Sequence, residues 1–295
     1  MKQLTIFYQN VRGLKSKLPS LQIIAAEYCP SIICIVETHL SENDPDFAQW
    51  SEDVEGDQSL FQIEGYNVIR NDRNGSGGGC LIAYKKELRT LITELDADAE
   101  KHENLWITVG NDVAKIKLGV IYMPGENTRK KELQDAYKEI ESELHNRKPN
   151  ERLLIWGDFN AKLKIEEQTE SPAGEAMSRF IMKNDLVVMN YSEKCVGKWT
   201  RVERNTRSVI DYVLTSNDCY VNHMMIDEEK DFSVYYHKKE QGETKKIYSD
   251  HNAILTNVKW GGVLELRNKD EKIRIMTKKG FDSYKQQFKR SQQCN

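Results

Sequence analysis

Residues 152–160 read Arg-Leu-Leu-Ile-Trp-Gly-Asp-Phe-Asn, an apolar run that ends in an aspartate and an asparagine. The run is short and rich in branched and aromatic side chains, so it predicts a strand over Arg152–Trp156. For Asp158 and Asn160 alone, the ordinary explanation is a turn. The same arrangement recurs along the chain, and the recurrence favours a site where rigid strands place polar side chains at one edge of a sheet.

Other strand-like segments also run directly into polar residues. The residues at these ends are Asn10, Glu37, Tyr122 and Asp211, and a late loop adds Asp250 and His251. Taken singly, Glu37 suits a solvated strand end, and Asp250-His251 suits a turn or a helix cap. Asp211 is less ordinary, because it interrupts the apolar run Val209–Leu214 and a buried carboxylate needs a partner. The set as a whole therefore predicts a functional site that no single member would establish.

Strand-like segments recur from one end of the chain to the other. They are Leu4–Gln9, Ile32–Glu37, Tyr66–Arg70, Cys80–Tyr84, Leu105–Val109, Lys115–Met123, Arg152–Trp156, Leu186–Met189, Val209–Leu214, Phe232–Tyr236 and Ala253–Val258. Amphipathic helices are expected over Lys17–Tyr28, Lys130–His145 and Ala173–Asn184. This pattern predicts an α/β fold in which sheets pack face to face with helices outside. We expect one domain over residues 1–260, followed by a basic polar extension or linker over 261–295.

Composition excludes several classes of protein. The chain has 295 residues, 39% of them hydrophobic and 30% charged, with a net charge of -3, which is typical of a globular domain and not of a disordered chain. No apolar run is long enough for a membrane span, and no secretory signal segment is visible. The six cysteines lack CxxC spacing, so we expect reduced thiols in an intracellular protein, without a zinc site or disulfides.

Charge is unevenly distributed, and four segments stand out. Ser41–Gln58 holds seven Asp/Glu, Glu193–Ser208 is an expected basic hairpin, His237–Lys246 carries four lysines, and Arg267–Asn295 has nine Lys/Arg against three Asp/Glu. For each alone a solvated surface is the simplest explanation. The two basic segments that precede Asp211 and Asp250 are better placed to contact a polyanion. Gly77–Gly79 lacks the GK[ST] ending of a phosphate loop and precedes a strand, so we expect a turn there.

These motifs, in this order, resemble the endonuclease/exonuclease/phosphatase superfamily over nearly all of residues 1–260. The matching blocks are Gln9–Leu14, Glu37-Thr38, Tyr122, Gly157–Asn160, Ile210–Tyr212 and Ser249–His251. The resemblance implies a DNase I-like four-layer α/β sandwich with two mostly antiparallel sheets, and a metal-dependent phosphodiesterase or phosphatase. Within the superfamily the chain looks like the AP-type endonuclease domain of non-LTR (LINE-type) retrotransposons. The blocks with that character are Glu37–Leu40, Gly77–Ile82, Trp156–Asn160 and Arg207–Tyr212.

Phosphodiester hydrolysis assigns a role to each of these residues. Glu37, Asn10 and Asp250 offer hard oxygen ligands, which predicts Mg²⁺, with Mn²⁺ as a substitute, and not zinc. Asp158 is the expected general base, and Asn160 is expected to position phosphate and water. His251 is expected to hydrogen-bond the phosphate with its ring held by Asp211, and Tyr122 to stabilise the transition state or the leaving group.

Basic side chains near these motifs predict contacts with DNA phosphates. The expected DNA-binding residues are Arg12, Lys15, Lys198, Arg201, Arg204, Arg207 and Ser208. Ser208 stands where AP repair endonucleases carry a tryptophan that helps to form a pocket for a base-free sugar, and retrotransposon enzymes commonly lack it. The resemblance therefore favours nicking of ordinary DNA over abasic-site repair.

The sequence thus predicts a Mg²⁺-dependent endodeoxyribonuclease that nicks double-stranded DNA to start target-primed reverse transcription. A reverse transcriptase domain is expected downstream in the same polyprotein, so this chain would be a piece of it, made in the cytoplasm and acting in the nucleus. The alternatives are an AP endonuclease or general DNase, and a phosphatase acting on inositol phosphates, lipids or nucleotides. A degenerate binding module is disfavoured, because each expected catalytic position holds the expected residue type.

Overall fold

The computed structural model of the protein describes residues 2–41, 63–73, 77–94, 103–111, 114–123, 125, 128, 130–148, 151–216, 221–240 and 243–260. Almost all of the acidic segment Ser41–Gln58, from residue 42 on, and all of the basic extension 261–295 lie outside the described residues. Among those residues, no helix combines the length and the apolar composition that a bilayer span requires.

The first sheet has seven strands in the order β10-β14-β17-β1-β2-β4-β3. Their bounds are Cys195–Val196 (β10), Val221–Ile226 (β14), Ile254–Trp260 (β17), Lys2–Asn10 (β1), Ile32–Val36 (β2), Cys80–Lys85 (β4) and Tyr66–Asn71 (β3). Most neighbours are antiparallel, whereas β1–β2 and β10–β14 are parallel.

The second sheet has six strands in the order β5-β6-β7-β8-β13-β9. Their bounds are Ile92–Glu94 (β5), Asn104–Gly110 (β6), Lys115–Tyr122 (β7), Glu151–Asp158 (β8), Asp211–Ser216 (β13) and Leu186–Val188 (β9). Here β7 and β8 are parallel and the other neighbours are antiparallel.

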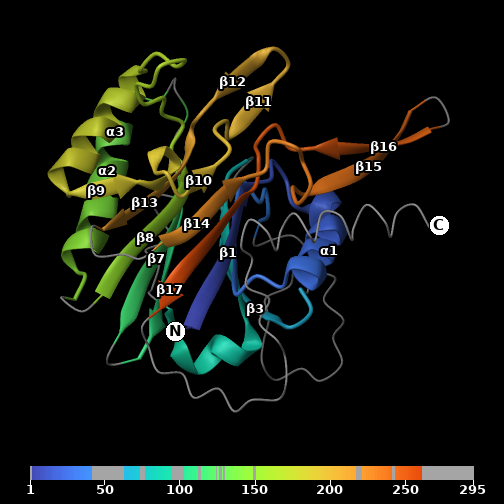
Figure 1. The fold of residues 1–295 in the computed structure, drawn as a ribbon, viewed down its shortest axis with the longest axis horizontal. Helices are drawn as coiled ribbons and strands as arrows, with labels where there is room; N and C mark the ends of the chain where they lie inside the picture. Colours follow the sequence, from blue (N-terminus) through green and yellow to red (C-terminus); the bar gives the residue numbers. More distant parts are fainter. Residues whose placement is uncertain are drawn as a thin grey trace.

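The helices cover the outer faces of the two sheets. They are α1 (Leu18–Tyr28), α2 (Lys130–His145) and α3 (Pro172–Lys183), with short 3-10 helices η1 (Lys15–Lys17), η3 (Lys86–Leu91) and η4 (Met189–Tyr191). In Figure 1, α2 and α3 lie on one side of the paired sheets and α1 lies on the other. The predicted four-layer α/β sandwich with two mostly antiparallel sheets is therefore confirmed.

Alternating side chains explain why the central strands read as continuous apolar runs. In β1, Ile6 and Tyr8 pack in the core between the sheets, whereas Phe7 packs in the layer beneath α1. In β8, Trp156 faces the inter-sheet core and Ile155 faces α2 and α3. Each of these strands is buried on both faces, so apolar residues are favoured at every position.

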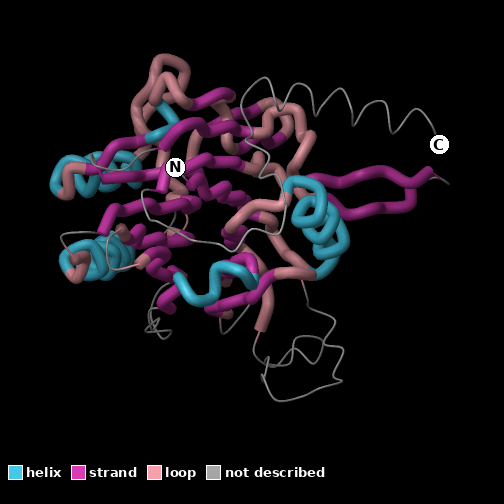
Figure 2. Tube along the Cα trace, turned by 60° about the horizontal axis from the view of Figure 1, so that its bottom comes forward, coloured by secondary structure: helices cyan, strands magenta, loops and turns pink. Residues whose placement is uncertain are grey.

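Two β-hairpins project from this body. One pairs β11 (Arg201–Glu203) with β12 (Thr206–Ser208), and the other pairs β15 (Tyr235–Glu240) with β16 (Glu243–Tyr248). The β11–β12 hairpin, expected from the sequence, rises at the top of Figure 1, and the β15–β16 hairpin extends to the right in Figures 1 and 2.

Some sequence-based boundaries were wrong. The strand expected over Phe232–Tyr236 begins only at Tyr235, because Phe232 and Val234 are apolar for packing against the α1 layer and lie in a connecting segment. The lysine-rich segment His237–Lys246, for which no strand was expected, lies mostly in β15 and β16. The strands β14 and β16 were not predicted, because half-exposed polar residues interrupt the apolar pattern of β14 and exposed polar residues make up most of β16.

Candidate active site

Three neighbouring strands of the second sheet end in a row of polar residues. The register pairs Tyr122 of β7 with Asp158 of β8, and Asp158 with Asp211 of β13. Asp211 is the first residue of its strand, which corrects the expectation that it lies inside one. Side chains directly opposite each other on adjacent strands lie close together. The predicted row of polar groups at one rim of the sheet is therefore present.

The first sheet closes this row from the other side. The Nδ2 atom of Asn10, the last residue of β1, donates to Asp158 Oδ2 at 2.9 Å and to Glu37 Oε1 at 2.8 Å. The hydroxyl of Tyr8 donates to Asp211 Oδ1 at 2.9 Å. Tyr8 was not predicted, although it lies two positions before Asn10 on the same strand and so shares its face. The site thus lies between the sheets, where both contribute.

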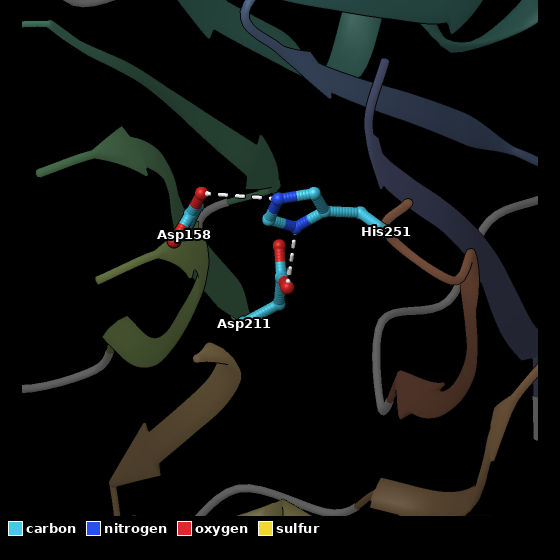
Figure 3. A group of neighbouring side chains, drawn as sticks. All are labelled: Asp158, Asp211 and His251. Atoms are coloured by element: carbon cyan, nitrogen blue, oxygen red, sulfur yellow. Dashed lines mark hydrogen bonds and ion pairs between the residues drawn. The ribbon is translucent and has the colours of Figure 1, made fainter. Parts of the chain in front are cut away.

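Asp158, Asp211 and His251 form a buried trio at the centre of the site (Figure 3). His251 Nδ1 lies 2.8 Å from Asp211 Oδ2, the pairing expected from the sequence. On the other edge of the ring, Nε2 lies 3.8 Å from Asp158 Oδ2. This separation is too long for a hydrogen bond, so Nε2 remains available to a substrate oxygen.

Burial and mutual charge shift the pKa of two members of this trio. Burial and the charge of Asp211 raise the pKa of Asp158 to about 7. Burial by itself lowers the pKa of His251, but the charge and hydrogen bond of Asp211 outweigh it and raise the pKa to about 9. At neutral pH, His251 is therefore protonated between two carboxylates, and Asp158 can exchange a proton.

Asp158 is held in place by its neighbours along the chain and across the rim. Its Oδ1 atom accepts a hydrogen bond from the backbone N–H of Asn160 at 2.9 Å, while Oδ2 accepts from Asn10. Asn160 has a left-handed backbone, with φ of 46°, and donates from Nδ2 to the carbonyl of Met123 at 2.9 Å. These bonds fix the Asp158 carboxylate. The side-chain oxygen of Asn160 takes part in none of them.

Glu37 lies at the more open side of the rim, immediately after β2. Its carboxylate accepts from Asn10, lies 3.2 Å from His39 Nε2, and hydrogen-bonds Tyr122. Burial, followed by the charge of Glu37, raises the pKa of Tyr122, so its phenol stays neutral. Glu37 and His39 both have left-handed backbones, with φ of 52° and 53°. Such strained conformations persist where the surrounding structure enforces them.

Asp250 is engaged by two arginines. Its Oδ2 atom lies 3.0 Å from Arg12 Nη1 and 2.8 Å from Arg201 Nε. Burial raises the pKa of this carboxyl, but His251 and the two arginines outweigh burial and lower it, so Asp250 is ionised at neutral pH. Its Oδ1 atom is buried and has no hydrogen-bond partner among the residues that the structure describes.

Two sets of residues could hold a divalent cation. Ligand atoms of Asp158, Asp211 and His251 lie within 4.8 Å of one another, and together they form a candidate acidic and histidine site. Tyr8 and His251 already satisfy both oxygens of Asp211, however, which leaves that trio better suited to holding a proton.

The predicted ligands Glu37, Asn10 and Asp250 also offer oxygen atoms to a hard cation. Glu37 is partly open, and the unpartnered Asp250 Oδ1 is a free ligand oxygen. These oxygens suit Mg²⁺ or Mn²⁺. Asn10 would have to change its bonding, because its Oδ1 atom now accepts from the backbone of Arg12 at 3.1 Å. The ligand assignment stays a prediction.

The β11–β12 hairpin adjoins the rim through its base. The backbone N–H of Val202 donates to the carbonyl of Asp250 at 2.8 Å, and Arg201 also contacts that aspartate through its side chain. A cavity of about 300 Å³ lies between the hairpin and Asn160. Its lining includes Asn160, Lys162, Arg201, Arg207, Ser208 and Ile210.

The predicted DNA-binding residues occupy different environments. Arg12 and Lys15 are exposed beside the rim, Arg204 and Arg207 are exposed on the hairpin, and Ser208 is half-buried at its base. Arg201 is half-buried against Asp250, and Lys198 pairs with Glu167 while lying 4.9 Å from the ring of Trp199. Arg12, Lys15, Arg204 and Arg207 are therefore the more accessible cations of the set, and DNA contact by all seven stays a prediction.

Two further residues that the sequence did not reveal hold the site in place. Thr200 Oγ1 accepts hydrogen bonds from the backbone of Ile210 at 2.9 Å and of Asp211 at 3.0 Å. Lys230 Nζ donates at 2.8 and 2.9 Å to the two carbonyls that flank Asp250. Both residues reach the site from connecting segments, whose position depends on the complete fold, so no local pattern could identify them.

Comparison with known proteins agrees with this geometry. A family model described as endonuclease-reverse transcriptase matches residues 116–255. No match was found among curated proteins. The endonuclease domain of TRAS1, a telomere-specific non-LTR retrotransposon, is a similar solved structure, with 16% identity and a TM-score of 0.62 over 87% of this chain and 98% of that one.

Other similar structures have different activities. An AP endonuclease from Leishmania major has 14% identity and a TM-score of 0.62 over 87% of this chain and 88% of its own. A mannosyl-6-phosphatase from Bacteroides thetaiotaomicron has 16% identity and a TM-score of 0.58 over 86% of this chain and 99% of its own. At these identities the likeness shows a shared fold, which serves both nucleases and phosphatases.

The match to this family model and the shared fold support the resemblance to the endonuclease/exonuclease/phosphatase superfamily that was inferred from the sequence. The description of that model, endonuclease-reverse transcriptase, agrees with the resemblance to LINE-type proteins.

Proposed function

We propose that this chain is a metal-dependent phosphodiesterase that nicks double-stranded DNA. It would be the target-site endonuclease that initiates target-primed reverse transcription of a non-LTR retrotransposon, with a reverse transcriptase downstream in the same polyprotein and chromosomal DNA in the nucleus as its substrate. The observation that carries the proposal is the convergence of Asp158, Asp211 and His251 with Asn10 and Glu37 at one rim. The family model, named for endonuclease and reverse transcriptase, supports the narrower assignment.

In this proposal Asp158 orients the attacking water and accepts its proton. The bonds from Asn160 and Asn10 fix the carboxylate, and its raised pKa suits a base that works near neutral pH. Asn160 would contact the scissile phosphate from the opposite end of the same turn.

His251 would stabilise the phosphate as negative charge builds up on it. Its Nε2 atom, protonated at neutral pH, faces the centre of the site and would donate to a phosphoryl oxygen. Asp211 binds Nδ1 and so fixes the ring and supports its positive charge. Tyr122, kept neutral beside Glu37, retains a proton that it would donate to the phosphate or the leaving oxygen.

A divalent cation would complete the site. Bound by Glu37, Asn10 and Asp250, it would neutralise charge on the phosphoryl oxygens and assist the departing oxygen. The two arginines contact Oδ2 of Asp250, which leaves Oδ1 for the cation.

The test compares three substrates in Mg²⁺ and in excess EDTA: supercoiled plasmid, duplex with one abasic site, and inositol phosphates. We expect Mg²⁺-dependent nicking of plasmid, with no preference for the abasic duplex and no phosphate release. Asp158→Ala, Asn160→Ala and His251→Ala should each lower nicking by about 100-fold or more. Asp135→Ala on α2 is the matched control and should nick normally. Nicking in EDTA, or faster hydrolysis of either other substrate, would contradict the proposal.

A further inference from the structure

The β15–β16 hairpin is built unlike the rest of the fold. It pairs with itself alone, outside both sheets, and it stands away from the body in both views (Figures 1 and 2). Its residues His237–Lys239 and Glu243–Lys246 are exposed. An isolated two-stranded ribbon is marginally stable and buries little apolar surface. The hairpin therefore adds little to the stability of the core, which suggests that its exposed side chains have another role.

Cations occur on both faces of the ribbon. The register places Lys239 and Lys246 on one face, and Lys238 and Lys245 on the other. Lys238 pairs with Glu240 at 2.7 Å, an exposed contact of small energetic value. Among the described residues, no ion pair engages the other three lysines. A ribbon with cations on both faces fits a groove of duplex DNA, which has a phosphate backbone on each side and is wide enough for two strands.

Aromatic side chains support the lysines at the base of the ribbon. Lys246 Nζ lies 4.2 Å from the centroid of the Tyr235 ring, and this ring also contacts the rings of His237 and Tyr248. Such contacts orient a lysine while leaving its charge available. The backbone N–H of Tyr235 donates to Ser20 Oγ of α1 at 3.0 Å, which anchors the ribbon to the body.

The ribbon is also continuous with the active site. β16 ends at Tyr248, and the next three residues are Ser249, Asp250 and His251. At the base of β15, the Tyr236 ring lies 5.5 Å from Lys17 Nζ, and that amine donates to the carbonyls of Arg12 and Gly13 beside the rim. A DNA duplex bound at the rim would therefore extend from the active site to the ribbon.

We propose that the β15–β16 hairpin is a second DNA-binding arm, which grips the phosphate backbone of the duplex away from the scissile phosphate. This inference rests on the proposed function, because it takes duplex DNA as the substrate. The two hairpins project in different directions from the rim, so together they would hold the duplex on two sides of the nick (Figure 1). The arm would supply affinity and leave the chemical step unchanged.

The test measures equilibrium binding of a long duplex in EDTA at several salt concentrations. The arm variant changes Lys238, Lys239, Lys245 and Lys246 to Gln. The matched control changes Lys130, Lys131, Lys138 and Lys183 to Gln, which are equally exposed but lie on α2 and α3, on the other side of the molecule. Each phosphate contact contributes about 0.9 to the slope of log K against log salt. We expect the slope to fall by about 2 to 4 in the arm variant and to stay unchanged in the control.

Nicking kinetics separate this inference from the proposed function. With Mg²⁺, the arm variant should need a higher DNA concentration, but its single-turnover rate at saturation should match the wild type. An unchanged salt slope in the arm variant, or an equal fall of the slope in the control, would contradict the inference that the hairpin binds DNA, even if the wild type nicks DNA. Salt-dependent binding through the arm without any nicking would instead overturn the proposed function and leave the arm standing.

Discussion

At the scale of single residues, one hydroxyl joins the two sheets at the site. Tyr8 belongs to the first sheet and is fully buried, and its hydroxyl donates to Asp211 of the second. Asp211 in turn holds His251. The Tyr8 hydroxyl does not touch the imidazole itself. It hydrogen-bonds the carboxylate that orients the imidazole ring. Partners of this kind tune the basicity and the position of the group that they hold.

We predict that Tyr8→Phe lowers the nicking rate by about 10-fold while the protein stays folded, because Asp211 loses one of its two partners. The control is Tyr137→Phe. The Tyr137 hydroxyl is also buried, but it has no hydrogen-bond partner among the described residues and belongs to the buried face of α2. The measurement compares the nicking rates of both variants, and thermal melting checks that both are folded. Equal activity in the two variants would show that the Tyr8 hydroxyl does not serve the site.

At the scale of elements, the turn Gly77–Gly79 supports the strained backbone of Glu37. Gly79 and Gly78 accept hydrogen bonds through their carbonyls from the backbones of Thr38 and His39 at 3.2 and 2.9 Å. The Gly79 N–H donates to the Glu103 carboxylate at 2.8 Å. All three glycines have positive φ, as the expected turn requires. The turn therefore fixes the segment that presents the predicted metal ligand.

Gly79→Ala should destabilise the protein by about 1–3 kcal/mol and reduce Mg²⁺-dependent nicking. A Cβ atom at this position would collide with Thr38 Oγ1 and push on the segment that follows Glu37. Gly65→Ala is the matched control. Gly65 has a similar φ of 82°, but a Cβ atom there meets nothing within 4 Å. The Mg²⁺ concentration for half-maximal nicking should rise only in Gly79→Ala. The same rise in both variants would mean that backbone strain alone, and not the collision with Thr38, causes the effect.

Elements also show which features a sequence can predict. The helix expected over Lys130–His145 has those bounds in the structure, because one-sided apolar spacing is a local signal. The strands that end in Asn10 and Asp158 were predicted for the same reason. β16 was not, because a projecting ribbon has no buried face to impose a pattern. The contact of Lys230 with the carbonyls around Asp250 depends on chain segments that meet only after folding.

At the scale of the whole molecule, the site is the place where the inter-sheet core ends. Trp156 and Tyr8 belong to that core, and the residues beyond them, Asp158 and Asn10, form the rim. Residues of the same strands thus build both the packing and the chemistry. The consequence is that two carboxylates and an imidazole are buried together, and their ionisation is coupled to the stability of the entire fold.

This coupling predicts how stability depends on pH in the metal-free protein. The pKa of Asp158 is raised to about 7 and that of His251 to about 9, so the folded state binds more protons than the unfolded state. Stability should therefore fall as pH rises, from about 4 to 7 through Asp158 and from about 6.5 to 9 through His251. Lys230, whose pKa burial lowers to about 8, acts in the opposite direction between about 8 and 10.5.

Comparison with a variant isolates the part due to His251. In EDTA, we expect His251→Asn to be less stable than the wild type at pH 6.5, because Asp211 loses its charged partner. Between pH 6.5 and 9.5 the difference in unfolding free energy should shrink by on the order of 1–3 kcal/mol, since only the wild type loses the proton on His251. Lys230 contributes equally to both proteins and cancels, whereas the pKa of Asp158 rises further in the variant, which lacks the charge of His251, and this offsets part of the change. Urea unfolding at four pH values measures the difference, and a constant difference would mean that His251 is neutral in the folded protein.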